Sequence, residues 1–444
     1  MNGRITEENR KQREIQYKNF VSLTGMTERQ MEDLAAERFA GAWSELTASQ
    51  KRGRLLSDQF LRSYGRSPEA KGEYQLVGWR SLFMPTEIMY AMGIMPLTVE
   101  MTAAQLAMMG LAVGRLETAE GNGYVQDICS FIKTGGGAVI EDILPSPDIL
   151  LTSTHICDPS AKFAMYAAHK YNRPEFVLDI PYSVWSYGPD EEGKKRYEDA
   201  VSYVADQLGD MVRFISSETG AVFDEAKLIE TIELANEARK WFLLGYKFLL
   251  EEPGAVQGSK DMDYAVNLMQ TWGTEQIVDV YKSRYDELRA AAKKKSAAGE
   301  KPKVRWAHLR PYYANTLIDY IEEKADIIGS HVNYIYWDEM DARDPFRELA
   351  RKTVLTPTYC QVGTRSSLIL QAMNKGEGLI AFYPKSCRHY HSSARMEQET
   401  FKKNGIPMLI LDSDCIDNRG DDFLIQKTRI DRFLKSLEQG QMRV

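Results

Sequence analysis

The feature that most constrains the fold of this chain is a short unit that occurs twice. In each copy, an apolar run that predicts a strand leads to a cysteine, a helical stretch, a proline and a second apolar run ending in aspartate. The first copy runs from "DILLTST" through Cys157 to "RPEFVLDIP", and the second from "GLIAFYP" through Cys387 to "IPMLILDSD". Strand–helix–strand units of this kind build parallel sheets, which bind ligands at the carboxyl ends of their strands. The repeat therefore predicts two sheets, each with a cysteine at its ligand-binding edge.

The rest of the chain divides by its apolar periodicity into alternating helical and mixed regions. We predict an α/β protein with two parallel-sheet domains of the flavodoxin or Rossmann type, together with a helical N-terminal region and a helical middle segment. The predicted regions are an N-terminal helical region 1–75, a first α/β domain 76–187, a helical segment with a linker 188–303, and a second α/β domain 304–444.

Charge and hydropathy exclude several classes of partner. The 444 residues carry a net charge of −7, with acids and bases interspersed, so no nucleic-acid partner is expected. The first 20 residues are charged throughout and lack the apolar segment of a secretory signal. Apolar stretches elsewhere are broken well short of a membrane span, so no membrane partner is expected. These observations predict a cytoplasmic protein.

Five cysteines are too few and too scattered for a disulfide scaffold, and no C-x-x-C pair suggests a zinc ribbon. Cys157 and Cys387 each precede a helix, whose N-terminus favours the thiolate that a metal needs. Cys129, in "DICSFIK", also comes before a helical stretch and is a third candidate, with a core position as the alternative. Three thiolates can hold an iron–sulfur cluster and leave one iron open to substrate. We interpret Cys360 and Cys415 as structural, because neither lies between a strand and a helix.

Four segments in order resemble the 2-hydroxyacyl-CoA dehydratase and benzoyl-CoA reductase family. They are "VGWRSLFMPTEIMYAMGIMPL", "DICSFIK", "PSPDILLTSTHICDPSAKFAMYAAHKYNRPEFVLDIPY" and "KSCRHYHSSARMEQETFKKNGIPMLILDSDCIDNRG", with "TRIDRFLKSL" near the end. Together they span residues from about 75 to 436. The middle helical region fits the family only in its length and character.

The resemblance implies an enzyme subunit that carries a 4Fe–4S cluster and pairs with a homologous second subunit. A separate ATP-hydrolysing iron–sulfur activator protein would inject one electron, and an acyl-CoA thioester would become a ketyl radical that expels its 2-hydroxyl group. In the reductase branch the same apparatus reduces an aromatic ring. Position by position, Cys129, Cys157 and Cys387 match the cluster ligands of the family.

The resemblance also suggests residues that act on the substrate. Glu87, in "PTEI", matches a family glutamate and is expected to be a base whose pKa is raised by desolvation, with a helix-capping role as the alternative. Ser81 lies close to the position of a substrate-contacting serine. His155 is an unfamiliar neighbour of Cys157 and either hydrogen-bonds a ligand or caps a strand. His389 stands near Cys387 and either donates hydrogen bonds at the site or has a surface or capping role.

Three interpretations within the family stay open. The chain is a lyase subunit of the dehydratase type, a core subunit of an ATP-dependent benzoyl-CoA reductase, or a cluster-bearing electron-transfer partner of the same family. A flavin or nucleotide binder would also use the sheet edges, but it would need a phosphate loop where this chain has cysteines. "TGGGAVI" does not supply one, because no Lys-Ser/Thr pair follows it at the Walker spacing.

Overall fold

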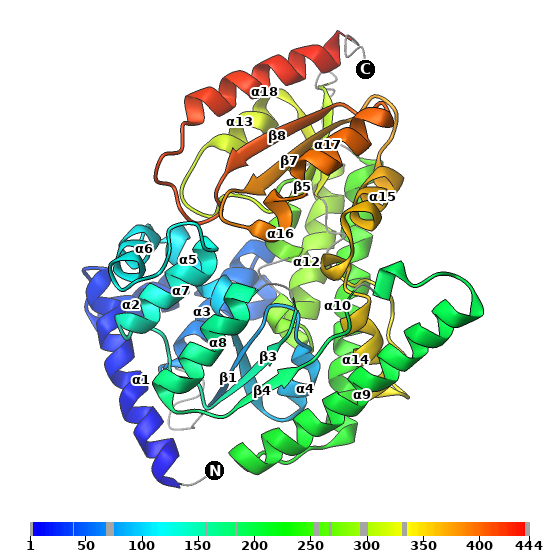
Figure 1. Cartoon of the computed structure of the whole chain (residues 1–444). Coiled ribbons are helices and arrows are strands. Elements are labelled where there is room, and N and C mark those ends of the chain that lie inside the picture. The colour runs from blue at the N-terminus through cyan, green and yellow to red at the C-terminus, as the bar shows by residue number, and fades with distance from the viewer. Residues whose placement is uncertain are drawn as a thin grey trace.

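A computed structural model supplies the fold. It describes residues 3–38, 40–67, 75–155, 158–182, 184–252, 257–265, 269–293, 301–330 and 335–439. Two four-stranded sheets, one in the lower half of Figure 1 and one in the upper half, organise these residues.

The two sheets have the same topology and all of their strand pairs are parallel. The first has the order β2-β1-β3-β4 and the second the order β6-β5-β7-β8, so in each sheet the first strand in sequence lies between the second and the third. The strands are β1 (Leu76–Arg80), β2 (Ile94–Thr98), β3 (Ile149–Ser153), β4 (Glu175–Leu178), β5 (Lys303–His308), β6 (Asp326–Ser330), β7 (Gly378–Pro384) and β8 (Met408–Ser413). The predicted fold class, with two parallel sheets, is confirmed.

Burial explains why the inner strands have nearly continuous apolar sequences. Every residue of β3, "ILLTS", and of β7, "GLIAFYP", is buried, as expected for parallel strands covered by helices on both faces. Trp79 of β1 lies beside Leu150 of β3, and Trp306 of β5 lies beside Ile380 of β7. The edge strand β4 is only partly buried.

Helices precede, connect and cover the sheets. The N-terminal helices are α1 (Gly3–Leu23), α2 (Glu28–Arg38), η1 (Trp43–Glu45) and α3 (Ala48–Ser63). The first sheet is connected by α4 (Thr86–Ala91), α5 (Val99–Met108), α6 (Ala112–Gly121), α7 (Ser130–Ile140) and α8 (Asp158–Tyr171). The second sheet is accompanied by α13 (Leu317–Lys324), α14 (Pro345–Val354), η5 (Pro357–Tyr359), α15 (Val362–Ala372), α16 (Arg388–His391), α17 (Ala394–Lys403) and α18 (Phe423–Glu438).

The middle of the chain is helical, as the sequence predicts. It comprises η3 (Val184–Ser186), α9 (Glu191–Thr219), α10 (Glu225–Glu251), α11 (Lys260–Ala265), η4 (Met269–Thr271) and α12 (Glu275–Ala292). Asp224 caps α10 by accepting a hydrogen bond from the Ala226 amide, so the predicted start of this helix is confirmed. No helix in the described ranges is both long and apolar enough to cross a bilayer.

The two halves of the molecule share side chains across their boundary. Ala103 of α5 and Phe131 of α7 belong to the apolar core around Trp306 of the second sheet. In return, Leu349 of α14, which lies between β6 and β7 in sequence, packs into the core around Ile149 of the first sheet. Figure 1 shows α5 and α7 between the sheets and α14 beside α9. This exchange holds the two sheets in a defined relative position.

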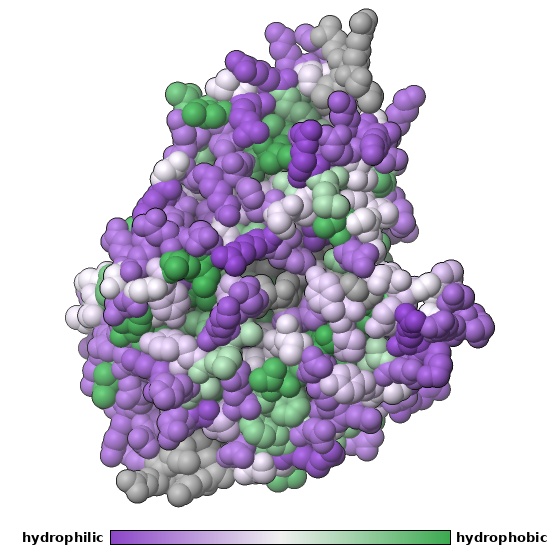
Figure 2. All heavy atoms as spheres, viewed as in Figure 1, coloured by the Kyte–Doolittle hydropathy of each residue, from purple (hydrophilic) through white to green (hydrophobic). Residues whose placement is uncertain are grey.

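Hydrophilic residues predominate on the face seen in Figure 2, and hydrophobic residues lie there in small separate patches. Such a surface is ordinary for a folded protein, because isolated apolar side chains at the surface require no explanation. No extended apolar patch marks a binding site on this face.

Candidate functional site

A cavity of about 110 Å³ lies where the carboxyl edges of the two sheets approach each other. Ser81 reaches it from the end of β1, His155 from the end of β3, and Cys387 and His389 from the segment after β7. Cys129 reaches it from the start of α7. The apolar part of the wall consists of Leu82, Phe83, Met101, Phe131, Ile132, Met269 and Leu309. The structure thus brings together five of the seven predicted site residues, although their chemical roles stay predictions.

The two described candidate thiols occupy equivalent positions. Cys129 is the N-cap of α7 and Cys387 is the N-cap of α16, and both are half-buried. Burial raises the pKa of the Cys387 thiol, and the backbone N–H groups of Tyr390 and His389, which donate to its sulfur, offset part of that rise. The backbone donors thus favour the thiolate, as expected at a helix N-terminus, while desolvation of Cys387 favours the thiol.

The third predicted ligand, Cys157, lies outside the described residues, just before α8. Within the ranges that the structure describes, no three metal-ligating side chains come together. Cys360 is buried, and burial raises the pKa of its thiol to about 11. Cys415 is fully buried, and its thiol is close enough to Cys387 and Cys129 for their charges to contribute to the rise of its pKa, after burial and Asp414.

Ser81 and a second glutamate form the polar side of the cavity. The Ser81 hydroxyl accepts a hydrogen bond of 3.2 Å from the backbone N–H of Ser153, which ties it to the end of β3. Glu100, in the first turn of α5, is partly buried at the cavity wall, and its Oε1 accepts a hydrogen bond of 3.2 Å from the Ser160 hydroxyl. No donor among the described residues reaches its other oxygen, Oε2.

Desolvation raises the pKa of Glu100, and the hydrogen bonds from its own backbone N–H and from Ser160, with the Arg80 charge, offset only part of that rise. Sequence reasoning missed this residue. The signal was present, since Glu100 comes two residues after the strand "IMPLT" and begins a helix, as the cysteines do at their own strand ends. A buried carboxyl group of raised pKa at a cavity wall has the properties of a general acid or base.

The two histidines are both neutral near pH 7, and burial is the main cause for each of them. Burial lowers the pKa of His155 to about 4, and its ring stacks on Tyr182 with the ring centres 4.8 Å apart. Burial and then the Arg365 guanidinium lower the pKa of His389 to about 4. Arginine can only donate, so Nε2 of His389 accepts the 3.3 Å hydrogen bond from Arg365.

Behind His389, a buried network holds the segment that carries Cys387. Glu397 is fully buried and accepts hydrogen bonds from Arg365, Tyr383 and His308, the Arg365 contacts measuring 2.9 and 2.7 Å. These partners hold the pKa of Glu397 well below its ordinary value despite burial. Arg365 also donates to the Ser393 hydroxyl, so α16 and α17 are joined to the network. Sequence reasoning did not identify Arg365 or Glu397.

Glu87 does not line the cavity. Its side chain is fully buried in the first turn of α4, where Lys352 of α14 lies 2.7 and 2.9 Å from its two oxygens and Arg239 of α10 lies 3.6 Å away. Burial alone raises the pKa of Glu87, but the Lys352 ammonium and the Arg239 guanidinium outweigh it and hold the pKa below its ordinary value. The expectation of a raised pKa is therefore wrong, because the sequence did not reveal the two cations.

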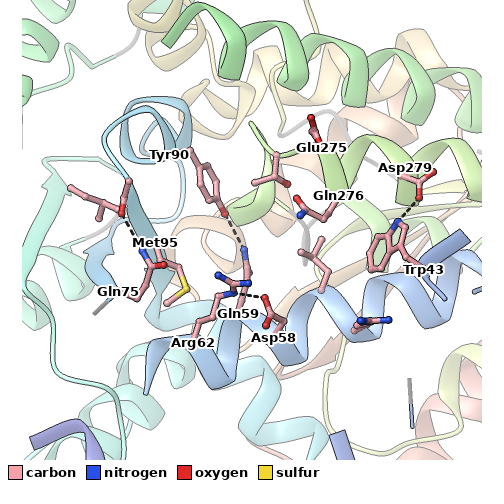
Figure 3. Close-up of a pocket in the computed structure, with 15 residues that line it drawn as sticks. Trp43, Asp58, Gln59, Arg62, Gln75, Tyr90, Met95, Glu275, Gln276 and Asp279 are labelled. Atoms are coloured by element: carbon pink, nitrogen blue, oxygen red, sulfur yellow. Dashed lines mark hydrogen bonds and ion pairs between the residues drawn. The ribbon is translucent and has the colours of Figure 1, made fainter. Parts of the chain in front are cut away.

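A larger hollow of about 630 Å³ lies at the other end of the first sheet, near the starts of β1 and β2. Figure 3 shows that its polar side chains pair with one another, with Arg62 against Asp58 and the Trp43 indole against Asp279. None of the described residues that line it is a cysteine or a histidine. We therefore place the candidate site at the smaller cavity, where the thiols and the buried carboxyl group meet.

Known proteins are similar to this chain over most of its length. Residues 81–437 match the family described as 2-hydroxyglutaryl-CoA dehydratase, D-component. The chain is 24% identical over 374 residues to the (R)-phenyllactyl-CoA dehydratase alpha subunit of Clostridium sporogenes, covering 79% of this chain and 87% of that subunit. It is 22% identical over 410 residues to the (R)-2-hydroxyisocaproyl-CoA dehydratase alpha subunit of Clostridioides difficile, covering 87% and 96%.

A relative with another named activity is similar to the same extent. A benzoyl-CoA reductase subunit of Thauera aromatica is 23% identical over 375 residues, covering 77% of this chain and 83% of that protein. The resemblance to dehydratases and benzoyl-CoA reductases seen in the sequence is thus confirmed. The family match extends over most of the chain, from the end of β1 to the last helix. This chain belongs to the 2-hydroxyglutaryl-CoA dehydratase D-component family.

Proposed function

We propose that this chain is the iron–sulfur, substrate-activating subunit of a 2-hydroxyacyl-CoA dehydratase, a lyase that removes water from a 2-hydroxyacyl-CoA. The observation that carries the proposal is the meeting of Cys129, Cys387 and Glu100 at one cavity between the carboxyl edges of the two sheets. Thiols suit an iron–sulfur cluster, and a buried carboxyl group suits proton transfer. An electron-carrier subunit would need the thiols but not Glu100.

The donor set fits a 4Fe–4S cluster. Cys129 and Cys387 are half-buried thiols in the wall of an apolar cavity, and two backbone N–H groups point at the Cys387 sulfur. Hydrogen bonds of this kind to cluster sulfurs, together with an apolar surrounding, are the means by which proteins adjust such clusters. Cys129 and Cys387 would hold the group together with Cys157, the third ligand that the family resemblance supplies. When bound, the cluster supplies one-electron redox chemistry and an iron open to substrate.

The chain's own residues would position the substrate and exclude water. The Ser81 hydroxyl, anchored by the Ser153 amide, is available to donate a hydrogen bond to an oxygen of the substrate. The apolar side chains around it, such as Phe83 and Met101, exclude water from the reacting atoms. His389 receives a hydrogen bond from Arg365, so its role is to support the wall next to Cys387.

Glu100 is the best-placed group to take a proton from the substrate carbon. Its Oε2 carries no donor from the described residues, and burial raises its pKa, which makes the carboxylate a stronger base. The base predicted from the sequence, Glu87, lies outside the cavity wall and is neutralised by Lys352. We therefore assign the proton-accepting role to Glu100. The same role, predicted for Glu87 from the sequence, is tested with the variant Glu87→Gln.

The proposed function requires partners. By analogy with relatives that are named as subunits, we infer that the chain pairs with a homologous second subunit. We further infer a separate ATP-hydrolysing iron–sulfur activator, an acyl-CoA thioester as substrate, and a cytoplasmic location, where thiols stay reduced. The second candidate function is that of a benzoyl-CoA reductase subunit, which the likeness to the Thauera aromatica protein favours.

The test is turnover by the assembled enzyme. The chain is purified without oxygen together with its second subunit, then incubated with the activator, ATP and either an (R)-2-hydroxyacyl-CoA or benzoyl-CoA. We expect loss of water from an aliphatic or aromatic 2-hydroxyacyl-CoA, detected by mass spectrometry and dependent on ATP. Addition of two hydrogens to benzoyl-CoA would support the second candidate instead. An iron-loaded, activated complex that converts no thioester of either class would contradict both.

A further inference from the structure

Asp414, directly after β8, accepts an unusual number of hydrogen bonds for one carboxylate. It is only 4% exposed. Its Oδ2 accepts from the hydroxyl of Ser386 at 2.6 Å and from the amide of the same residue at 3.2 Å. Its Oδ1 accepts from the Ser130 hydroxyl and from the amides of Ile416 and Asp417 at 3.0 and 3.2 Å. Five donors thus converge on one acceptor-only group.

The two serines are the immediate neighbours of the candidate thiols. Ser130 follows Cys129 at the start of α7, and Ser386 precedes Cys387 at the start of α16. The two serines also contact each other directly, because the Ser130 amide donates to the Ser386 hydroxyl at 3.0 Å. The carboxylate therefore links two segments that are 256 positions apart in sequence and belong to different halves of the molecule.

The loop that carries Asp414 is fastened to the first half of the molecule at a second point. Arg419 pairs with Glu120 of α6 at 2.7 Å, and Lys133 of α7 pairs with the same glutamate at 2.6 Å. Two separate contacts therefore hold this loop against α6 and α7. A carboxylate anchored in this way can fix the spacing between the two segments, because neither serine can move away without breaking a hydrogen bond to this buried group.

We propose that Asp414 is a positioning residue that sets the spacing between Cys129 and Cys387 and so makes the cavity able to hold its cluster. The inference rests on the proposed function, since it concerns the same site. Asp414 does not line the cavity, and it acts only through Ser130 and Ser386. Residues that orient metal ligands in this manner commonly change metal affinity by about 10-fold or more when they are replaced.

The variant that tests the proposal is Asp414→Asn. The amide keeps the shape of the side chain but replaces one acceptor oxygen with a donor. In one orientation that donor faces the Ser386 amide, and in the other it faces the Ile416 and Asp417 amides, so a buried backbone N–H group always loses its acceptor. A milder variant, Ser386→Ala, removes the hydrogen bond from the Ser386 hydroxyl to Asp414 and leaves the carboxylate in place.

Asp148 provides a matched control at the opposite edge of the first sheet. It is 3% exposed and accepts hydrogen bonds from Asn9, from Arg13 and from the backbone N–H of Val77, at 2.6, 2.6 and 2.8 Å. Asp148→Asn therefore also damages a buried carboxylate that joins distant segments. It lies away from the cysteines, so it reports what lost stability alone does to cluster binding.

The experiment uses the full chain with its second subunit, loaded with iron and sulfide without oxygen. Three quantities are measured for each variant: the rate of iron release to a chelator, the EPR spectrum of the reduced cluster, and the melting temperature. We expect iron release from Asp414→Asn to be about 10-fold faster than from the wild type, with an altered EPR spectrum. Asp148→Asn should melt earlier yet keep the wild-type release rate and spectrum. If Asp414→Asn does not accumulate, Ser386→Ala is judged by the same criteria.

Two results would overturn the inference. One is an Asp414→Asn or Ser386→Ala chain whose iron release and EPR spectrum match those of the wild type. The other is a release rate that follows the melting temperature equally in the Asp414 and Asp148 variants, which would make Asp414 merely structural. A wild-type complex that takes up no iron would contradict the proposed function, and with it the inference, so the two failures are distinguishable.

Discussion

The two sheets share a strand order but differ in what they present at their facing edges. The second sheet's edge is closed by a saturated network, in which Glu397 binds Arg365, Tyr383 and His308. The first sheet's edge instead presents Ser81 and Glu100, whose polar atoms are only partly engaged. Topology alone therefore does not assign chemistry. We infer that the second sheet holds its thiol rigidly and that the first sheet acts on the substrate.

The largest effect that would test this difference is expected from removing the carboxylate of Glu100 at the edge of the first sheet. Glu100→Gln keeps the size of the side chain but deletes the base. We expect the variant to bind its cluster normally and to lose at least about 100-fold in turnover, the usual scale of general-base catalysis. The measurement is the ATP-dependent dehydration rate at equal iron content. Turnover within a fewfold of the wild type would remove Glu100 from the proton transfer.

The next largest effect is expected at Glu87, which we infer to stabilise the fold and to take no part in catalysis. Glu87→Gln leaves the buried cations Lys352 and Arg239 without their carboxylate, which we expect to cost about 3 kcal/mol of unfolding free energy. Chemical denaturation measures this loss. Turnover per folded, iron-loaded molecule should stay close to that of the wild type. A stable variant with at least about 100-fold lower turnover would restore Glu87 as the base.

The same carboxylate gives a prediction about pH. Because the pKa of Glu87 in the folded chain lies below its ordinary value of 4.5, ionised Glu87 stabilises the fold above that value. This contribution disappears as the pH falls from 4.5 through the lowered pKa, at up to about 1.4 kcal/mol per pH unit. Glu87→Gln should therefore lose stability less steeply than the wild type on acidification. Parallel slopes in denaturation experiments below pH 4.5 would contradict the assigned direction.

The smallest expected effect is at Ser81. Ser81→Ala removes one hydroxyl group from the cavity wall while the Ser153 amide loses a single acceptor. A neutral hydrogen bond contributes about 1 kcal/mol, so we expect kcat/KM to fall about fivefold with no loss of iron. The matched change at the second sheet is Ser393→Ala, whose hydroxyl accepts from Arg365 away from the cavity wall. An equal fall in kcat/KM for Ser81→Ala and Ser393→Ala would contradict the proposed difference between the edges of the two sheets.

Sequence reasoning succeeded where the signal was local. The strand, cysteine and helix of each unit are continuous in sequence, so the two sheets and the position of Cys387 at a helix start could be predicted. Cys129 lies outside both units, and its position was predicted from the helical stretch that directly follows it. Sequence reasoning did not distinguish the surroundings of Glu87 from those of Glu100, because both residues lie in the first turn of a helix soon after a strand. What separates them is Lys352, 265 positions from Glu87, and no local pattern reveals such a partner.

Asp414 is a second example of this limit. The sequence shows this aspartate at the end of the second unit. Its partner Ser130, however, lies 284 positions away, on a helix of the first half. Arg365 and Glu397 likewise become a network only after α15 and α17 pack together. Packing between distant segments decides which of many similar polar residues face the cavity.

The most direct test of the central claim is the iron and acid-labile sulfide content of the chain after purification without oxygen. We predict a brown wild-type complex, and Cys129→Ser, Cys157→Ser and Cys387→Ser variants that lose most of their iron, because a serine oxygen is a poorer ligand than a thiolate. Cys360→Ser and Cys415→Ser should keep it. A colourless wild type, or equal iron loss at all five cysteines, would contradict the account.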